Sequence, residues 1–262
     1  MKVMGVVNVT PDSFSDGGLY IEPHKAIAHG RALVAAGADV LDVGGESTRP
    51  GASEVDSELE KDRILPVIEG LSGTVPISID TTKAAVAEVA ISAGAEIVND
   101  VSALRGDPEM AALCAEKDVD LILMHMLGSP RTMQDDPTYG DVVSEVREFL
   151  LARAQSAIEQ GVARERIWLD PGIGFGKTLE HNLSLLAATC RFRETGFPVL
   201  IGPSRKAFIG KIDGSDRDQR LGGTIAACLA ARSGGASMVR VHDVEEVVQA
   251  IRIQGQIEAH GE

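Results

Sequence analysis

Short apolar segments recur along the chain, and each ends in a polar or acidic residue before a helical pattern begins. Eight such segments cover residues 3–8, 40–42, 77–80, 97–100, 121–125, 167–170, 199–204 and 238–242. Apolar, β-branched runs of this length are typical of strands buried on both faces, as in a parallel sheet. Between them, helical periodicity extends over residues 24–36, 55–70, 82–93, 108–117, 141–159, 180–191, 221–232 and 244–258.

Eight strand–helix units in 262 residues predict an α/β protein of the (β/α)8 TIM-barrel class, with a single domain over residues 1–262. The alternative is an open doubly wound sheet, which requires a reversal of strand order that a sequence does not reveal. The count of eight favours the barrel. The active site of such a barrel lies at the carboxyl ends of its strands, and here those ends carry Asn, Asp, His, Lys and Arg, which indicates an enzyme.

Three connections are longer than the two to six residues usual between a strand and a helix. They cover residues 10–23, 45–54 and 126–140. Long loops at the catalytic face of a barrel are more often substrate clamps than filler. We therefore expect loops 10–23 and 45–54 to be mobile and to lie over the active site.

The charge of the chain restricts its partners. With 39 acidic and 25 basic residues the formal net charge is −14, which disfavours nucleic acid and anionic membrane as partners. An anionic ligand then needs a local cluster of basic groups. No apolar run approaches the length of a membrane span, and no signal-peptide pattern is present. The three cysteines form no CxxC pair and lie in helical patterns, so we expect buried thiols in a reducing cytoplasm.

Polar side chains at or just after four of the strand ends indicate a binding cavity. Asp80, Asn99 and Asp170 end the third, fourth and sixth apolar segments, and Lys206 follows the seventh. In a closed barrel these ends converge, and buried carboxylates need partners. A flat amino-heterocycle that alternates N–H donors with acceptors would satisfy all four groups. An Asp–Lys ion pair with helix caps is the alternative, but it explains one pair and not the set.

A second group of residues is suited to an anion. Arg240 and His242 alternate on the last strand and so point to the same face. Arg49 lies in a loop stiffened by Pro50, where a guanidinium can make bidentate contact with phosphate. Asn8 ends the first strand and can offer its carbonyl oxygen to Mg²⁺ or to bound phosphate. Near the closure of the barrel these residues would form one anion site.

Two further features are weaker. His125 ends the fifth strand, but a single histidine there is more often a buried structural residue than a catalyst. Residues 172–178 resemble a phosphate-binding P-loop, yet Pro171 occupies the first glycine position, and Asp170–Pro171 ends a strand without direct entry into a helix. We reject a P-loop and expect the glycines to let the loop pass close to ligand, with Phe175 free to stack.

Taken together, these segments resemble the dihydropteroate synthase family over essentially the full length of the chain. The matching blocks are residues 4–18, 42–51, 78–81, 99–102, 170–177, 202–206 and 240–242. One departure is residues 103–106, which read Ala-Leu-Arg-Gly where a tighter glycine-containing turn is expected.

The resemblance implies condensation of 6-hydroxymethyl-7,8-dihydropterin diphosphate with 4-aminobenzoate, with Mg²⁺ as cofactor, in a cytoplasmic homodimer. It implies a pterin site made by Asp80, Asn99, Asp170 and Lys206. It implies a diphosphate site made by Asn8, Arg49, Arg240 and His242, with Asn8 also binding the metal. It implies an aminobenzoate pocket made by Phe14, Thr48, Pro50 and Phe175. Direct roles in catalysis fall on Phe14, Asp16, Arg49 and Lys206.

Two other functions are compatible with such a pocket. A pterin-dependent methyltransferase would keep the acidic pterin pocket but would have no use for Arg49, Arg240 and a metal-binding Asn8. A catalytically silent pterin-binding paralogue would keep the pocket without turnover. A phosphate-binding aldolase or isomerase is disfavoured, because only Lys206 is placed to form a Schiff base.

Overall fold

The computed structural model describes residues 1–10, 23–47 and 54–260. Its strands are β1 (Lys2–Asn8), β2 (Val40–Gly44), β3 (Ile77–Asp80), β4 (Ile97–Asp100), β5 (Asp120–Met124), β6 (Ile167–Asp170), β7 (Leu200–Ile201) and β8 (Met238–Val241). They form one parallel sheet in the order β6-β5-β4-β3-β2-β1-β8-β7. A parallel bridge between Leu169 and Val199 joins its two ends. The predicted barrel is therefore confirmed, and the open doubly wound sheet is excluded because this bridge closes the sheet and the strand order contains no reversal.

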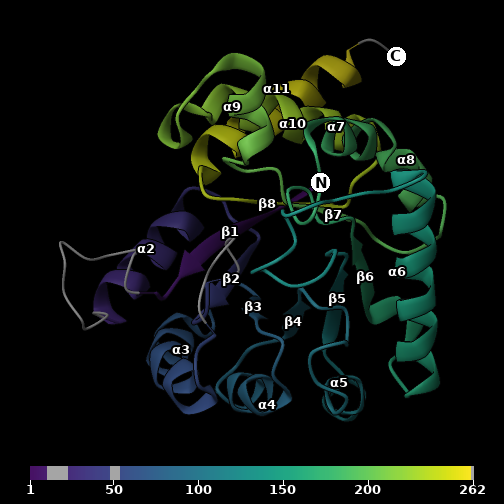
Figure 1. The fold of residues 1–262 in the computed structure, drawn as a ribbon. Helices are drawn as coiled ribbons and strands as arrows, with labels where there is room; N and C mark the ends of the chain where they lie inside the picture. The colour runs from purple at the N-terminus through teal and green to yellow at the C-terminus, as the bar shows by residue number, and fades with distance from the viewer. Residues whose placement is uncertain (11–22, 48–53, 261–262) are drawn as a thin grey trace.

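Helices surround the strands, which occupy the centre of the molecule (Figure 1). They are α2 (Pro23–Ala35), α3 (Ser57–Leu71), α4 (Ala84–Ser92), α5 (Met110–Lys117), α6 (Val142–Glu159), α7 (Leu179–Ala187), α8 (Thr189–Arg193), α9 (Ala207–Asp213), α10 (Leu221–Ser233) and α11 (Val244–Ala259). Short 3₁₀ turns cover Arg164–Arg166 and Arg217–Gln219. No helix in the described ranges combines the length and the apolar character needed to cross a membrane.

One helical prediction was wrong, and one helix was missed. The helix predicted over residues 180–191 is divided into α7 and α8, because the Thr189 hydroxyl donates to the Leu186 carbonyl (2.8 Å) and competes with the backbone ladder. Helix α9 was not predicted, because seven residues are too few to show a clear period. It ends at Gly214, whose φ of 77° is the left-handed conformation favoured at a helix C-terminus.

Apolar side chains, one from nearly every strand, fill the interior of the barrel toward the amino-terminal ends of the strands. This layer consists of Met4, Val40, Ile97, Ile122, Leu200 and Met238, with Trp168 packed against it. Strand side chains alternate between faces, so the inward residues above this layer are those at the carboxyl ends. Apolar packing thus fills one end of the barrel and leaves the polar residues at the other.

The prediction of three buried cysteines holds for two of them. Cys114 and Cys228 are buried, whereas Cys190 is exposed. Cys190 lies on the short helix α8, only one turn long, so its helical pattern did not reveal which face is covered.

Candidate active site

A buried polar cluster lies directly above the apolar layer. Arg240 on β8 donates from Nε to Asp42 on β2 and from Nη2 to Asp80 on β3, with 2.8 Å between Nη2 and Oδ2. Asn99, which is in register with Asp80, donates from Nδ2 to the same Asp42 oxygen (3.3 Å). The predicted residues Asp80, Asn99 and Arg240 are therefore brought together. Asp42, which links two of them, was not predicted as a site residue, although its strand-end position was the available signal.

Three oxygen atoms of this cluster have no hydrogen-bond partner among the described residues. They are Asp42 Oδ1, Asp80 Oδ1 and Asn99 Oδ1, and all three are buried. Leaving a buried acceptor unpaired costs about 1–3 kcal/mol. Each of these atoms accepts hydrogen bonds, so the cluster is suited to a ligand that presents several N–H groups close together.

Burial raises the pKa values of two carboxyl groups of the site toward neutral pH. It raises the pKa of Asp80 to about 7, against the opposing charge of Arg240 and with the added repulsion of Asp42. It also raises the pKa of Asp170 to about 6, although the Gly172 N–H donates to Oδ1 of this residue (2.7 Å). Asp42 and Asp80 raise the pKa of Arg240 in spite of burial, so the guanidinium stays charged.

Lys206 precedes α9 and lies against an aromatic ring. Its Nζ is 3.9 Å from the centre of the Phe175 ring. Burial lowers the pKa of Lys206 to about 8, with a further contribution from Arg240. The neighbouring Arg205 adopts a φ of 54°, and its guanidinium binds both carboxylate oxygens of Asp243, which fixes the turn that presents Lys206.

Phe175, which was predicted to stack on the ligand, belongs to an apolar wall whose other members were not predicted. Its packing partners are Val101, Met124, Met126 and Met133. The signal that was available is the position of Met124 and Met126 at and just beyond the end of β5. A flexible thioether next to an aromatic ring forms an adaptable surface for a flat ligand.

A cavity of about 540 Å³ opens beside this wall. Asn8, Phe175, Lys206, Arg240 and His242 line it, so predicted residues of all three sub-sites share one space. Its other basic lining residues are Lys177, Arg205, Lys211, Arg217 and Arg220. In a chain of net charge −14, this concentration of cations defines a local site for an anionic ligand.

His242 acts in this cavity as a neutral group. Its Nδ1 lies 2.9 Å from Ser204 Oγ. Burial lowers the pKa of His242 to about 3, and the charge of Arg240 adds to the effect. At neutral pH the imidazole therefore offers a hydrogen bond to an anion and no charge.

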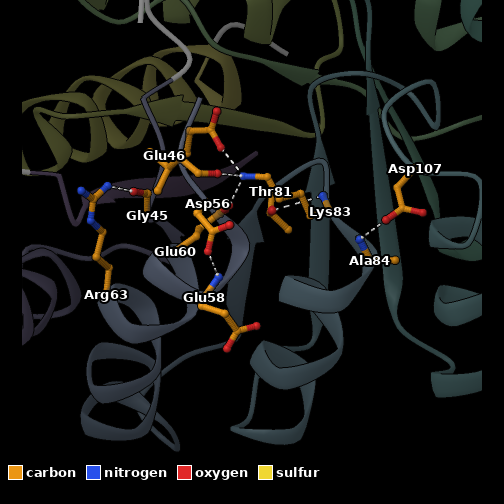
Figure 2. A network of polar contacts seen from close by, with 11 residues as sticks. Gly45, Glu46, Asp56, Glu58, Glu60, Arg63, Thr81, Lys83, Ala84 and Asp107 are labelled. Carbon is orange, nitrogen blue, oxygen red and sulfur yellow. Dashed lines mark hydrogen bonds and ion pairs between the residues drawn. The ribbon is translucent and has the colours of Figure 1, made fainter. Parts of the chain in front are cut away.

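A second cavity, of about 480 Å³, extends from Asp80 over the ends of β3 and β4. On its wall, Lys83 donates to Glu46, to Glu60 (2.6 Å) and to the Val55 carbonyl (2.8 Å), as Figure 2 shows for the two glutamates. Glu60 is only 1% exposed, so the ammonium supplies the charge that this buried carboxylate needs. Glu46 and Val55 lie on either side of residues 48–53, and Lys83 therefore bonds to both flanks of that segment from the start of α4.

The turn that departs from the family pattern adopts an unusual backbone. Ala103 and Leu104 have φ values of 51° and 63°, which a glycine would adopt more easily. Asp100 compensates by accepting from the Ser102 N–H (2.8 Å), the Ser102 hydroxyl and the Leu104 N–H (both 2.6 Å). A buried carboxylate therefore holds a turn in which neither residue with a positive φ is a glycine.

Gly172 is required by the path of the loop after β6. Its φ is +70°, and a Cβ atom there would lie 2.0 Å from the His125 carbonyl oxygen. We expect Gly172→Ala to lower the free energy of unfolding by about 3 kcal/mol or more, the sum of left-handed strain and a backbone shift. Urea denaturation measures this loss of stability. Gly73→Ala is the matched control, because Gly73 has a φ of +78° and no atom lies within 4 Å of the Cβ that the substitution adds. Equal losses of stability in the two variants would contradict the steric argument.

Five predicted residues lie outside the described part of the chain. They are Phe14, Asp16, Thr48, Arg49 and Pro50. The roles assigned to them, and the mobility expected of loops 10–23 and 45–54, stay predictions.

Comparison with known proteins identifies the class to which this site belongs. A family described as pterin binding enzyme matches residues 4–242. The chain belongs to this pterin-binding enzyme family.

Relatives of the chain carry one particular name. Dihydropteroate synthase from Synechocystis sp. is 48% identical over 254 residues, which cover 96% of this chain and 88% of that protein. The Escherichia coli dihydropteroate synthase is 44% identical over 253 residues, with 96% and 89% covered. The Xanthomonas albilineans dihydropteroate synthase solved with 4-aminobenzoic acid has a TM-score of 0.93 and 47% identity, covering 98% of this chain and 93% of that one.

Proposed function

We propose that this chain is a dihydropteroate synthase, a transferase of folate biosynthesis. It would join 6-hydroxymethyl-7,8-dihydropterin diphosphate to 4-aminobenzoate and release diphosphate. The single observation that carries the proposal is the row of unpaired buried acceptors on Asp42, Asp80 and Asn99 beside a cavity lined with cations. A heterocycle rich in N–H donors that bears a diphosphate matches both halves of this site.

The pterin ring is the part recognised by the acidic cluster. Asp80, Asn99 and Asp170 accept from its ring N–H and amino groups, and Lys206 donates to its acceptor atoms. The Phe175 ring and the methionines next to it cover the flat face of the heterocycle. This arrangement also supports Phe175 as a boundary between the pterin and the aminobenzoate, because its ring lies against Lys206 within the shared cavity.

The diphosphate is assigned to Asn8, Arg240, His242 and Arg49. No group of three or more Asp, Glu, His or Cys residues that could hold a metal occurs in the described ranges. Asn8 supplies one oxygen at the cavity wall, which fits Mg²⁺, an ion that is usually bound through substrate phosphates, water and few protein groups. When bound, Mg²⁺ supplies positive charge that stabilises the departing diphosphate.

The reaction breaks the bond between the pterin methylene carbon and the diphosphate oxygen and forms a bond from that carbon to the aminobenzoate nitrogen. The nitrogen then loses a proton. A neutral aromatic amine is already nucleophilic, so positioning and electrostatic stabilisation of the leaving group account for most of the rate. Arg240 contributes positive charge here, and Lys206 orients the ring. Phe14, Asp16 and Arg49 are proposed to complete the site from the two long loops.

We expect kcat/KM for the pterin diphosphate to rise between about pH 5 and pH 8. Asp170 and Asp80 accept hydrogen bonds fully only as carboxylates, and their pKa values are about 6 and about 7. Because kcat/KM reports the ionisations of the free enzyme, a pH profile measures this directly. The Asp170→Asn variant is expected to lose the limb near pH 6, and an unchanged profile in that variant would contradict the assignment.

Stability changes in the opposite direction over the same range. Both carboxyl groups have a raised pKa in the folded chain, so between about pH 4 and pH 7 the folded state binds protons that the unfolded state has lost. Their contribution to stability is therefore present at low pH and is lost as the pH rises through about 7. The site is suited to function at a pH where its own carboxylates destabilise the fold.

The homodimer and the cytoplasmic location belong to the same proposal. Ile253 and Ile257 on α11 are 58% and 68% exposed. Together with Leu229 on α10 they line a shallow groove. Exposed apolar side chains gathered over two helices support association through this face.

The test is diphosphate release by the purified protein with the pterin diphosphate, 4-aminobenzoate and Mg²⁺, each omitted in turn. Release that depends on both organic substrates and falls when Mg²⁺ is chelated is the expected result. Tight pterin binding without release would instead indicate a silent paralogue or a methyltransferase. A sulfonamide, which resembles 4-aminobenzoate, then probes the second substrate pocket.

A further inference from the structure

Lys177 lines the edge of the cavity but has no assigned role in the proposed reaction. It is only 2% exposed, and it follows directly on the glycine-containing loop after β6. Its Nζ lies 2.8 Å from the Phe175 carbonyl oxygen, 3.0 Å from His125 Nδ1 and 3.4 Å from the His125 carbonyl oxygen. Burial lowers the pKa of His125 to about 3, so all three of these partners are uncharged.

A buried ammonium whose hydrogen-bond partners are all neutral is costly, because none of the groups bonded to it carries an opposite charge. The nearby carboxylate of Asp170 offsets this cost only in part. Burial accordingly lowers the pKa of Lys177 to about 7. A neutral residue of similar length could fill the same space at lower cost. The position of this lysine therefore requires another explanation, which its contacts provide.

The loop that Lys177 holds has an alternating backbone. Gly172, Gly174 and Gly176 have φ values of 70°, 85° and 64°, so the chain turns at every second residue. Such a segment makes no ladder of its own backbone hydrogen bonds, and its carbonyl groups need side-chain donors.

Each carbonyl from Gly174 to Gly176 has a side-chain donor. Gln134 Nε2 donates to Gly174 O (2.7 Å), Lys177 to Phe175 O, and the Tyr139 hydroxyl to Gly176 O (2.8 Å). The contact from Lys177 is the central one of the three and acts on the residue whose ring faces Lys206. The direction of its Nζ, toward the loop backbone and His125, differs from that of a P-loop lysine, which reaches a phosphate.

We propose that Lys177 is a positioning residue that holds the Phe175 ring against Lys206 and so sets the affinity for the pterin ring, while the diphosphate is bound without it. The inference rests on the proposed function. In this assignment Lys177 supports the position of an aromatic side chain. A lysine at the same spacing in a P-loop would instead bind phosphate.

The experiment compares two ligands on the wild-type protein and on Lys177→Met. Calorimetry with a pterin that lacks the diphosphate reports the ring site, and calorimetry with inorganic diphosphate and Mg²⁺ reports the anion site. We expect Lys177→Met to weaken pterin binding about tenfold or more and to change diphosphate binding less than twofold. Lys117→Met is the matched control, since Lys117 pairs with Glu116 at the surface of α5 and should change neither.

Loss of diphosphate binding with intact pterin binding would overturn the proposal and make Lys177 a phosphate ligand. Unchanged affinity for both ligands would overturn it as well. Tyr139→Phe is the second variant if Lys177→Met does not fold, because it removes only the hydroxyl that binds Gly176 O. Tyr139→Phe is expected to weaken pterin binding about threefold and to leave diphosphate binding unchanged. An unchanged pterin affinity would contradict the proposal that donors to the loop carbonyls hold the Phe175 ring in place. Failure of the wild-type protein to bind pterin would instead refute the proposed function.

Discussion

Replacing Arg240 with methionine is expected to lower kcat/KM for the pterin diphosphate by about 10²–10³-fold, the usual effect of removing a preorganised group that stabilises developing charge. Arg240 is the only side chain seen to bond to both Asp42 and Asp80 among the described residues, and it also lines the cavity assigned to the diphosphate. Its loss removes charge from the leaving group and leaves two buried carboxylates without their cation. Steady-state kinetics with both substrates measures the effect.

The matched control is Arg166→Met. Arg166 also pairs with two carboxylates, those of Asp118 and Asp120, but at the amino-terminal end of the barrel strands. We expect that variant to keep kcat/KM within about twofold, since exposed ion pairs contribute little. Equal losses of activity in the two variants would show that the effect of Arg240 is on folding and not on the site.

A double-mutant cycle separates the two roles of Arg240. Asp42→Asn removes one negative charge that Arg240 neutralises, and residues in direct contact are expected to show non-additive effects. In the double variant the loss of stability should be smaller than the sum of the single losses. The loss of activity should stay as large as in Arg240→Met. Additive changes in stability would contradict the buried pair as the structure shows it.

Lys206→Ala is expected to lose far more activity than His125→Ala. The Lys206 ammonium lies in the cavity against the Phe175 ring, where its removal should cost about 10²–10³-fold in kcat/KM. His125 contacts Lys177 and does not line that cavity. We expect His125→Ala to lose less than about tenfold, a size consistent with an indirect effect on position.

Two measurements make this ranking decisive. Circular dichroism and thermal unfolding must show that both variants are folded. Lys211→Ala is the matched control for charge, because this exposed lysine lies in the same cavity lining and its loss should change kcat/KM by no more than about threefold. Comparable losses for Lys206→Ala and His125→Ala in folded protein would reject the assignment of Lys206 to the pterin.

The polar ends of the strands could be predicted because they follow from local pattern. A strand buried on both faces must be apolar, so the residue at which polarity returns marks its end. Asp80, Asn99 and Asp170 were found in this way, and all three lie in the described strands as expected. Phe175 was predicted from its glycine-containing loop, but the methionines Met124 and Met126 beside it were not. Apolar residues near a strand end look the same whether they line a site or fill the core.

The sequence by itself therefore determined the eight strand–helix units, their order along the chain and the positions at which the strands end in polar residues, since these depend on periodicity along one chain. Only the tertiary structure decided that the sheet closes and which of those residues meet. The bonds from Arg240 to Asp42 and Asp80 join residues 198 and 160 positions apart in the chain. The contact between Lys177 and His125 joins residues 52 positions apart, on loops that follow two different strands. Such contacts are set by the register and tilt of all eight strands together, and no local segment carries that information.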